Sequence, residues 1–547
     1  METITTVLLL LVAVVISAAA ARMLPRVLPL PLIQIAIGFA VSGITGSGIR
    51  LEPDIFFLLF LPPLLFLDGW RIPKEGLFRD IGTVLELAFG LVVFTTLGIG
   101  FLVHWLIPAI PLPVAFALAA ILSPTDPVAV TAIAARVNVP RRLMHVLEGE
   151  SLLNDASGLV CMRFAVAAAM TGAFSLADAA ASFVWLVLGG LAIGIVVTWI
   201  LTWSKNRVAR DYGEDTGSQI LVSLLIPFVA YLAAEKVGGS GILAAVAAGM
   251  TMSYSEQSGR ALATTRIRRN AVWDMVQFAL NGMMFVVLGE QLPRIVASAA
   301  QVVSETGHVS PLWMIVYVLL INVALVALRF LWVWVALRFS IRAALKRGDP
   351  PPAPGWRLVA ATSVAGARGA ITLAGILTIP FLLPDGDPFP ARDLVIFLAA
   401  CAIIVSLVLA SVALPPLLKG LAVPAEPHER QQEDAVRAAA ATAAIEAAQA
   451  MMRTLPRDGA DNDLYTHASA RLIDYYKERI AGYSAKEQSD MDRFRAAARA
   501  EREVWLAALQ AEREAIYREA RRNAVPDDVA RRLVHEVDLL ETRAQES

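Results

Sequence analysis

The sequence predicts an all-α polytopic membrane protein that continues into a soluble helical domain. Of its 547 residues, 57% are hydrophobic and 17% are charged, whereas soluble domains contain about 45–50% apolar and about 25% charged residues. Apolar runs of about 20 residues, the length that spans a bilayer as a helix, recur up to residue 419, and charged residues gather after Pro424. We therefore expect a membrane domain over residues 1–422 and a helical tail over 423–547.

The first apolar run is expected to remain in the protein as a membrane helix. The segment before Val7 carries Glu2 and no Lys or Arg, while Arg22 and Arg26 follow the run. A signal peptide carries its positive charge before its apolar stretch. The observed order indicates a retained first span with the N-terminus outside.

About thirteen spans are expected along the chain. Prolines interrupt the second run and the ninth is short and rich in Gly and Ala, so twelve spans remain an alternative. The expected ranges are 4–22, 27–45, 54–70, 82–107, 112–136, 145–172, 181–203, 218–236, 239–254, 272–292, 312–338, 357–383 and 392–419.

The loops between these runs test the count independently, because Lys and Arg gather on the cytoplasmic side of membrane proteins. Alternate loops are basic and the intervening loops carry few positive charges. This asymmetry predicts thirteen spans, an external N-terminus and a cytoplasmic C-terminus. The basic loops include Arg136, Arg141 and Arg142, then Lys205, Arg207 and Arg210, then Arg260, Arg266, Arg268 and Arg269.

The tail is expected to form helices over about 432–453, 462–481, 484–523 and from 526 onward. Its role is open between regulation and a solvated extension without a ligand. Cys161 and Cys401 lie inside apolar runs, which indicates buried thiols and neither a disulfide framework nor a metal site. No nucleotide loop, nucleophile elbow or metalloprotease motif is present, so neither enzymatic activity, a cofactor nor a nucleic-acid partner is expected.

The fifth span carries an acid between two prolines, in the segment Ser123–Pro127. Each proline removes a backbone donor and disturbs the preceding turn, so we expect the helix to unwind here and expose carbonyls beside Asp126. A charge at the bilayer centre costs about 2.5–3.5 kcal/mol on insertion scales. Such interrupted helices form cation sites in many secondary transporters, although Asp126 capping a proline kink is an alternative.

The sixth span begins with the segment Glu148–Asp155. Ser151 and Asp155 are four residues apart and share one helical face. Oxygen ligands suit a hard cation such as Na⁺, and the same carboxylate can accept a proton instead. Competition of the two ions for Asp155 is therefore expected to couple their movement.

The twelfth span carries an arginine, Arg368, among small residues. A buried guanidinium is tolerated when it meets a carboxylate, and Glu150 is the expected partner. Asp68 at the end of the third span is either a further ion ligand or a surface acid. Structural roles are favoured for the other intramembrane charges, Glu86, Arg163 and Arg329, although the sequence does not assign them.

Five segments together resemble one known family: LFLPPLLFLDGW, ILSPTDPVAV, LEGESLLNDASGLV, SGILAAVAAGM and GARGAITLAGIL. They are similar to the monovalent cation:proton antiporter-1 family, the sodium/proton exchangers of the NhaP and NHE type, over roughly residues 5–420. The resemblance implies two inverted six-helix repeats with discontinuous helices, an ion-carrying core that moves against a scaffold, and a homodimer. The thirteen spans fit this fold as six helices, one linker helix and six helices.

The resemblance also implies roles for individual residues. Asp155 is the alternating carrier of Na⁺ and H⁺, and Asn154 precedes it in the family's Asn-Asp pair, which is typical of electroneutral exchange. The cation shell is completed by Ser151, the backbone carbonyl of Thr125, and Asp126, with Asp68 as a less secure match. A supporting ion pair joins Glu150 and Arg368.

The predicted function is antiport of cytoplasmic Na⁺, or Li⁺, against external H⁺ across the cell membrane, for sodium transport and pH homeostasis. A K⁺/H⁺ antiporter using the same residues is the alternative. A cation channel with a cytosolic sensing tail is a third interpretation, but it predicts a pore-loop filter. Ion preference, stoichiometry, the pH set-point and the ligand of the tail are not determined by the sequence.

Overall fold

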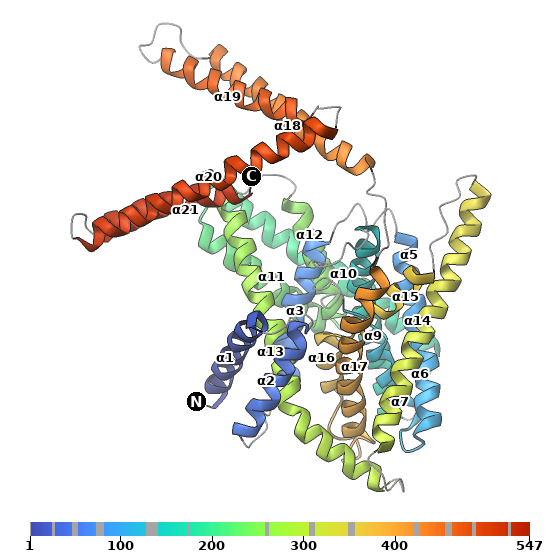
Figure 1. Ribbon diagram of the computed structural model, residues 1–547. Helices are drawn as coiled ribbons and strands as arrows, with labels where there is room; N and C mark the ends of the chain where they lie inside the picture. Colours follow the sequence, from blue (N-terminus) through green and yellow to red (C-terminus); the bar gives the residue numbers. More distant parts are fainter. Residues whose placement is uncertain are drawn as a thin grey trace. The chain divides into compact units, whose positions relative to one another are not determined.

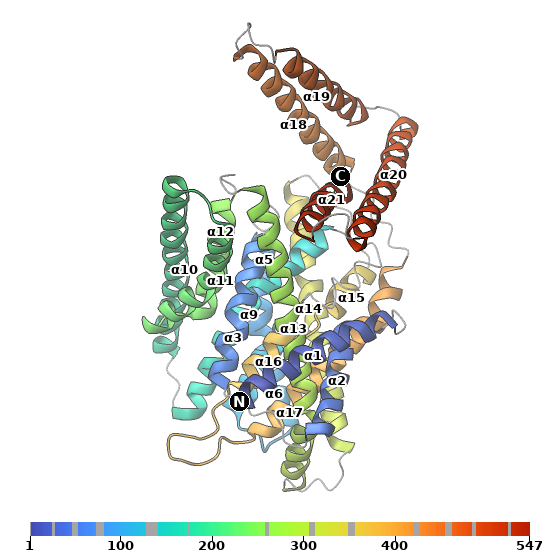
Figure 2. The ribbon, with the colours of Figure 1, turned by 90° about the vertical axis from the view of Figure 1, so that its left-hand side faces the viewer.

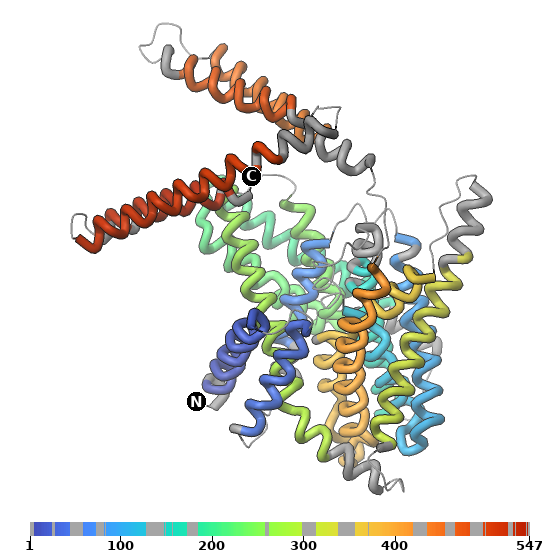
Figure 3. The backbone as a smooth tube through the Cα atoms, in the orientation of Figure 1, coloured from blue at the N-terminus to red at the C-terminus, as the bar shows by residue number. Residues whose placement is uncertain are grey.

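The protein is described here by a computed structural model. It describes residues 2–23, 28–45, 53–72, 81–126, 141–171, 176–256, 262–305, 312–347, 356–419, 427–454, 462–483, 488–522 and 527–546 (Figure 3). Within these ranges the chain is helical apart from short loops and one isolated bridge between Leu382 and Pro388. The all-α class is thus confirmed. The chain separates into two compact units, Met1–Leu421 and Ala422–Ser547.

The first unit is a bundle of long apolar helices (Figure 1). Its first half comprises α1 (Glu2–Met23), α2 (Leu30–Thr45), α3 (Pro53–Arg71), α5 (Ile81–Leu85), the π-helix η1 (Glu86–Leu91), α6 (Val92–Leu106), α7 (Leu112–Leu122) and α9 (Arg141–Thr171). The helix α10 (Leu176–Tyr212) follows. The second half comprises α11 (Thr216–Lys236), α12 (Gly241–Glu256), α13 (Ala263–Glu305), α14 (Leu312–Arg347), α15 (Trp356–Val364), α16 (Ala370–Leu377) and α17 (Arg392–Leu418).

Each of the thirteen expected ranges overlaps a helix or an interrupted helix of this unit. The fourth range is continuous through α5, η1 and α6. In the fifth range α7 ends at Leu122, beside the predicted break, and the twelfth range is divided between α15 and α16. Among the described residues, eight helices are long and apolar enough to cross a bilayer. The membrane character is therefore clear, while the count of thirteen crossings stays a prediction.

The helix contacts have the internal symmetry expected of two repeated halves. Exchanging the halves converts the contact of α2 with α13 into that of α12 with α3, and both contacts exist. The same exchange relates α1 with α2 to α11 with α12, α7 with α9 to α15 with α17, and α3 with α9 to α13 with α17. The contact between α6 and α14 maps onto itself. Figure 2 shows α10 beside α11 and α12, at the join between the halves.

Glycines bring two symmetry-related helix pairs into close approach. A Cβ atom at Gly38 on α2 would collide with the carbonyl oxygen of Val286 on α13, and one at Gly289 with the carbonyl oxygen of Ile35. Small residues at a crossing allow helix backbones to approach in a membrane. The same reciprocal contact joins α3 and α12, through Gly69 and the Val246 carbonyl and through Gly249 and the Phe66 carbonyl.

An N-cap defines the start of α11. The Asp215 carboxylate accepts a hydrogen bond from the Ser218 N–H (2.8 Å), which satisfies one of the free donors at the helix start. This hydrogen bond lowers the pKa of Asp215. The linker between α10 and α11 therefore ends at a defined residue.

The second unit consists of two helix pairs. Helix α18 (Pro427–Thr454) packs against α19 (Asn462–Tyr483), and α20 (Gln488–Arg521) packs against α21 (Asp527–Glu546). Leu509, Val534 and Val537 are buried in the second pair. Arg513 on α20 forms ion pairs with two acids on α21, Asp538 (2.9 Å) and Glu541. The predicted helical tail is thus present.

Candidate functional site

Non-helical segments occur at similar positions in the two halves of the first unit. Helix α7 ends at Leu122, and Ser123–Asp126 are not helical. Pro124 and Pro127 account for this break because they remove donors from the helical ladder. The second break, over 365–369, separates α15 from α16. It contains Gly366 and Gly369, and glycine is a weak helix former.

The two non-helical segments are bonded to each other through the backbone. The Asp126 N–H donates a hydrogen bond to the Ala367 carbonyl oxygen (2.7 Å). Arg368 donates from Nε to the Leu122 carbonyl (3.0 Å) and from Nη1 to the Gly366 carbonyl (2.8 Å). Carbonyls freed by the breaks are therefore satisfied by one buried guanidinium.

The segments 123–126 and 365–369 meet at a crossing, where a cation lies at the C-terminal end of one helix and an anion at the N-terminal end of another. The Arg368 guanidinium binds Leu122, the last residue of α7, where the helix dipole favours a cation. The Asp126 carboxylate packs against Gly369, the residue that precedes α16, so closely that a Cβ atom at Gly369 would overlap it. A helix N-terminus favours an anion, so each charge compensates one half-helix.

The expected pairing of Glu150 with Arg368 is wrong. Glu150 is fully buried and accepts hydrogen bonds from both terminal nitrogens of Arg329. The distances are 2.5 Å from Nη1 to Oε1 and 2.7 Å from Nη2 to Oε2. This two-bond geometry matches the planar fork of Arg to a carboxylate. Arg368 instead uses its donors on backbone carbonyls. Arg329 comes from α14, and its Nε also donates to the Thr362 carbonyl on α15 (3.2 Å).

The hydroxyl of Thr125 links the non-helical segment 123–126 to α9. It donates to Glu150 Oε1 (3.3 Å) and accepts from Asn154 Nδ2 (3.3 Å). The sequence had suggested only the backbone carbonyl of Thr125, and its side chain is an additional contact. Asn154 is buried, and its Oδ1 atom has no hydrogen-bond partner among the described residues. One polar group of this cluster therefore remains available to a substrate ion.

Asp155 and Ser151 lie one turn apart on α9, and both are buried; Asp155 is 4% exposed. Asp126, Asp68 and Glu150 all interact electrostatically with Asp155. Asp126 is partly buried, whereas Asp68 on α3 is exposed. The structure thus gathers the predicted acids around Asp155, with Asp68 at the periphery.

The chemistry of this cluster suits a monovalent cation or a proton. The nearby oxygens belong to a carboxylate, hydroxyls, an amide and backbone carbonyls, which are hard donors. A buried carboxylate is costly unless its charge is compensated, so Asp155 is suited to binding one positive charge.

Sequence reasoning left two of the connections unassigned. The sequence favours a structural role for Arg329 but names no partner for it, and it assigns no role to the Thr125 hydroxyl. The signal for Arg329 is its position as a single charge within the apolar run 312–337. Its partner lies 179 residues away, so helix packing had to be known before the pair could be identified.

The comparisons with known proteins agree with the fold and the motifs. The sequence profile of the transmembrane sodium/hydrogen exchanger family matches residues 7–420. The chain is 41% identical to the protein described as the uncharacterized Na⁺/H⁺ exchanger YjcE of Escherichia coli, over 99% of this chain and 98% of that protein. It is 39% identical to the sodium, potassium, lithium and rubidium/H⁺ antiporter of Bacillus subtilis, over 94% of this chain and 74% of that protein.

A solved structure shares the fold. The sodium proton antiporter MjNhaP1 from Methanocaldococcus jannaschii superimposes with a TM-score of 0.59 and 19% identity, covering 78% of this chain and 99% of that chain. At this identity the match concerns the fold alone. The family assignment rests on the profile match and the long alignments. The chain belongs to the sodium/hydrogen exchanger family, a family of membrane antiporters.

Proposed function

We propose that this protein exchanges cytoplasmic Na⁺, or Li⁺, for external H⁺ by alternating access, with Asp155 as the carrier of both ions. The observation that carries this proposal is a buried carboxylate on α9 close to the crossing where the non-helical segments 123–126 and 365–369 are bonded to each other. Asn154 connects α9 to that crossing through Thr125 (3.3 Å). Ion release from Asp155 is thus physically tied to the position of the broken helices.

The proposed exchange follows from the cost of an uncompensated charge. Inside the bundle, Asp155 is stable when protonated or when it holds one monovalent cation, and unstable when it is bare. Ser151, the Thr125 carbonyl and Asp126 would complete the cation shell, with Asp68 as a further ligand. Glu150 is already neutralised by Arg329, and Asn154 is neutral. With Asp126 kept charged against the N-terminal end of α16, Asp155 is the group that gains and loses a proton. One positive charge then crosses in each direction, and the exchange is electroneutral.

The test is proton movement driven by Na⁺ in everted membrane vesicles. The wild-type protein is expected to dissipate an imposed proton gradient when Na⁺ is added, and Asp155→Asn to abolish this response because the amide cannot exchange a proton. The matched control is Asp385→Asn, the same substitution at an exposed loop residue, which should behave as wild type. Sodium-driven proton movement by Asp155→Asn would refute the carrier assignment.

K⁺/H⁺ exchange is the second candidate. It is favoured by one observation, the similarity to a Bacillus subtilis antiporter whose description includes sodium, potassium, lithium and rubidium. The responses of purified protein in liposomes to Na⁺, K⁺, Li⁺ and Rb⁺ distinguish a selective exchanger from a broad one. Stoichiometric proton counterflow in the same assay distinguishes both from a cation channel.

The proposed arrangement in the cell follows the charge pattern of the loops. The N-terminus would lie outside and the tail in the cytoplasm, in the inner or plasma membrane, with two copies forming a homodimer. Labelling of single cysteines placed at residue 2 and in the tail, from either side of the membrane, tests this orientation.

A further inference from the structure

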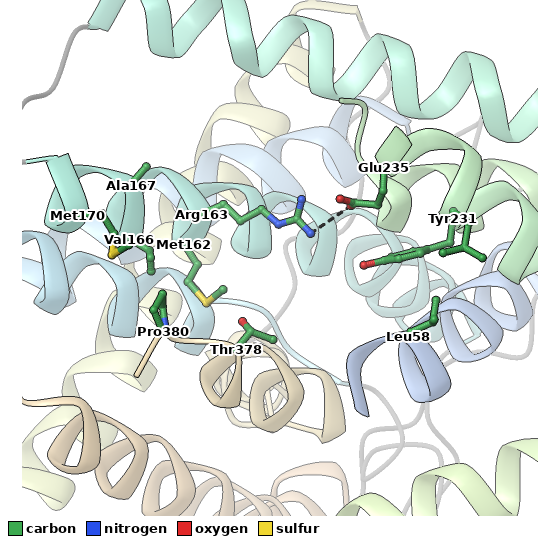
Figure 4. A pocket seen from close by; sticks show the side chains of 11 residues that line it. Leu58, Met162, Arg163, Val166, Ala167, Met170, Tyr231, Glu235, Thr378 and Pro380 are labelled. Carbon is green, nitrogen blue, oxygen red and sulfur yellow. Dashed lines mark hydrogen bonds and ion pairs between the residues drawn. The ribbon is translucent and has the colours of Figure 1, made fainter. Parts of the chain in front are cut away.

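A pocket of about 530 Å³ lies beside the helix that carries Asp155 (Figure 4). Its α9 wall includes Met162 and Val166, which follow Asp155 by seven and eleven residues. At 3.6 residues per turn these positions lie on the face of α9 that Asp155 occupies. The opposite wall comes from α11, through Tyr231 and Glu235. The pocket therefore lies on the same face of α9 as Asp155, about two to three turns closer to the C-terminal end of the helix.

One ion pair crosses this pocket. Arg163 Nη2 on α9 lies 3.2 Å from Glu235 Oε1 on α11 (Figure 4). The main packing partners of α9 are α7, η1, α5 and α6, whereas those of α11 are α12, α10, α3 and α13. The pair thus connects helices of two packing groups, which α9 otherwise joins through small contacts with α3 and α12. A side-chain bridge across a gap can open without disturbing the packing of either group.

The two ends of the bridge are held differently. Glu235 Oε1 also accepts a hydrogen bond from the N–H of Gly241 (3.2 Å), the first residue of α12. That helix N-terminus stabilises an anion, so the carboxylate keeps a partner when the ion pair opens. Arg163 is the end that can leave. Its side chain is 38% exposed and that of Glu235 is 34% exposed, so the pair is only moderately strong.

We propose that Arg163 and Glu235 are a positioning pair that latches the carrier helix α9 to α11 and biases which face of the membrane Asp155 can reach. This inference rests on the proposed exchange function. Because the loop charges place the C-terminal end of α9 outside, the latch lies on the external side of Asp155. A weak pair is suited to this role, since it shifts a conformational equilibrium and still opens in every cycle.

The test compares the apparent KM for Na⁺ at the two faces, using right-side-out and everted vesicles of the full-length protein. Arg163→Gln and Glu235→Gln should each change it by about two- to five-fold, in opposite directions at the two faces, because losing the latch favours the other conformation. Arg163→Lys retains the charge and should restore values close to wild type. The matched control is Arg207→Gln, which breaks an exposed ion pair within α10 and should leave both faces unchanged.

The outcomes separate the latch from the proposed function. If the wild-type protein exchanges Na⁺ for H⁺ and the two Gln variants shift both faces in the same direction, or neither face, the latch is wrong and the function stands. If the wild-type protein does not exchange these ions, the proposed function fails on its own.

A second measurement follows the latch by crosslinking in addition to exchange. In a background with Cys161 and Cys401 replaced by Ser, Arg163→Cys and Glu235→Cys would be joined by a short, reducible bis-thiol crosslinker. The latch predicts a crosslinking yield that changes with Na⁺ and pH, and loss of exchange that is restored by reduction. A yield that is independent of both conditions would show a fixed gap and overturn the proposal.

Discussion

Arg329 and Arg368 are both buried guanidinium groups, but they stabilise different parts of the same bundle. Arg329 neutralises Glu150 through two hydrogen bonds. Removing one partner of such a buried pair typically costs about 3–5 kcal/mol, because the other charge stays buried and uncompensated. Arg368 binds the carbonyls of Leu122 and Gly366, where it compensates the end of α7. Pairing Glu150 with Arg368, as the sequence analysis expects, would take that guanidinium away from the carbonyls of Leu122 and Gly366.

The Thr125 hydroxyl gives a prediction at the scale of one residue. Thr125→Val keeps the shape and the backbone carbonyl but removes the contacts to Glu150 and Asn154. The buried Asn154 amide would lose its acceptor, at a typical cost of about 1–3 kcal/mol, and its position beside Asp155 would be less defined. We expect weaker apparent Na⁺ affinity in everted vesicles. Thr125→Ser, which keeps the hydroxyl, is the control, and wild-type affinity in Thr125→Val would assign the role to the carbonyl alone.

At the scale of helices, the chain places its irregular segments and its close contacts in different regions. The breaks at 123–126 and 365–369 meet at the proposed ion site, where exposed backbone groups are useful. Regular helices α2, α3, α12 and α13 cross each other through glycines instead. The first arrangement exposes backbone polar groups inside the membrane, and the second brings helix backbones together without interrupting them.

A pair of glycines on α2 tests the packing of these crossings. Gly38→Ala would place its methyl group against the Val286 carbonyl, whereas Gly43 has nothing within 4 Å of an added Cβ. We expect Gly38→Ala to destabilise the bundle by about 1–3 kcal/mol through overpacking. Gly43→Ala should be neutral or stabilising, because Ala is a better helix former than Gly. Thermal unfolding of the purified protein in detergent measures both, and equal stability of the two variants would contradict the crossing.

At the scale of the whole molecule, every residue of the proposed ion site lies in the first of the two compact units. We therefore expect a chain that ends at Leu421 to insert into the membrane and to exchange Na⁺ for H⁺ at its site. Reconstitution of this chain and of the full-length protein in liposomes is the measurement. Complete loss of exchange from a correctly folded truncated protein would show that the tail is required, while a shifted pH dependence would identify the tail as regulatory.

Much of this protein follows from its sequence. Apolar runs predict membrane helices because burial of the backbone in lipid requires them, and Pro124 and Pro127 predict the break beside Asp126. The same reasoning identifies Asp155, Ser151 and Asn154 as a group, because they lie within two turns of one helix. These features depend on neighbouring residues, whose relative positions are fixed by local geometry.

The tertiary structure decided which distant groups meet. Glu150 pairs with Arg329 and not with Arg368, the Thr125 hydroxyl joins Glu150 to Asn154, and Arg163 reaches Glu235 across a pocket. Each partner is chosen by the distance and orientation of side chains on separate helices. Hydropathy and charge patterns do not distinguish one intramembrane arginine from another. The packing of the helices therefore determines which carboxylate or carbonyl each arginine reaches.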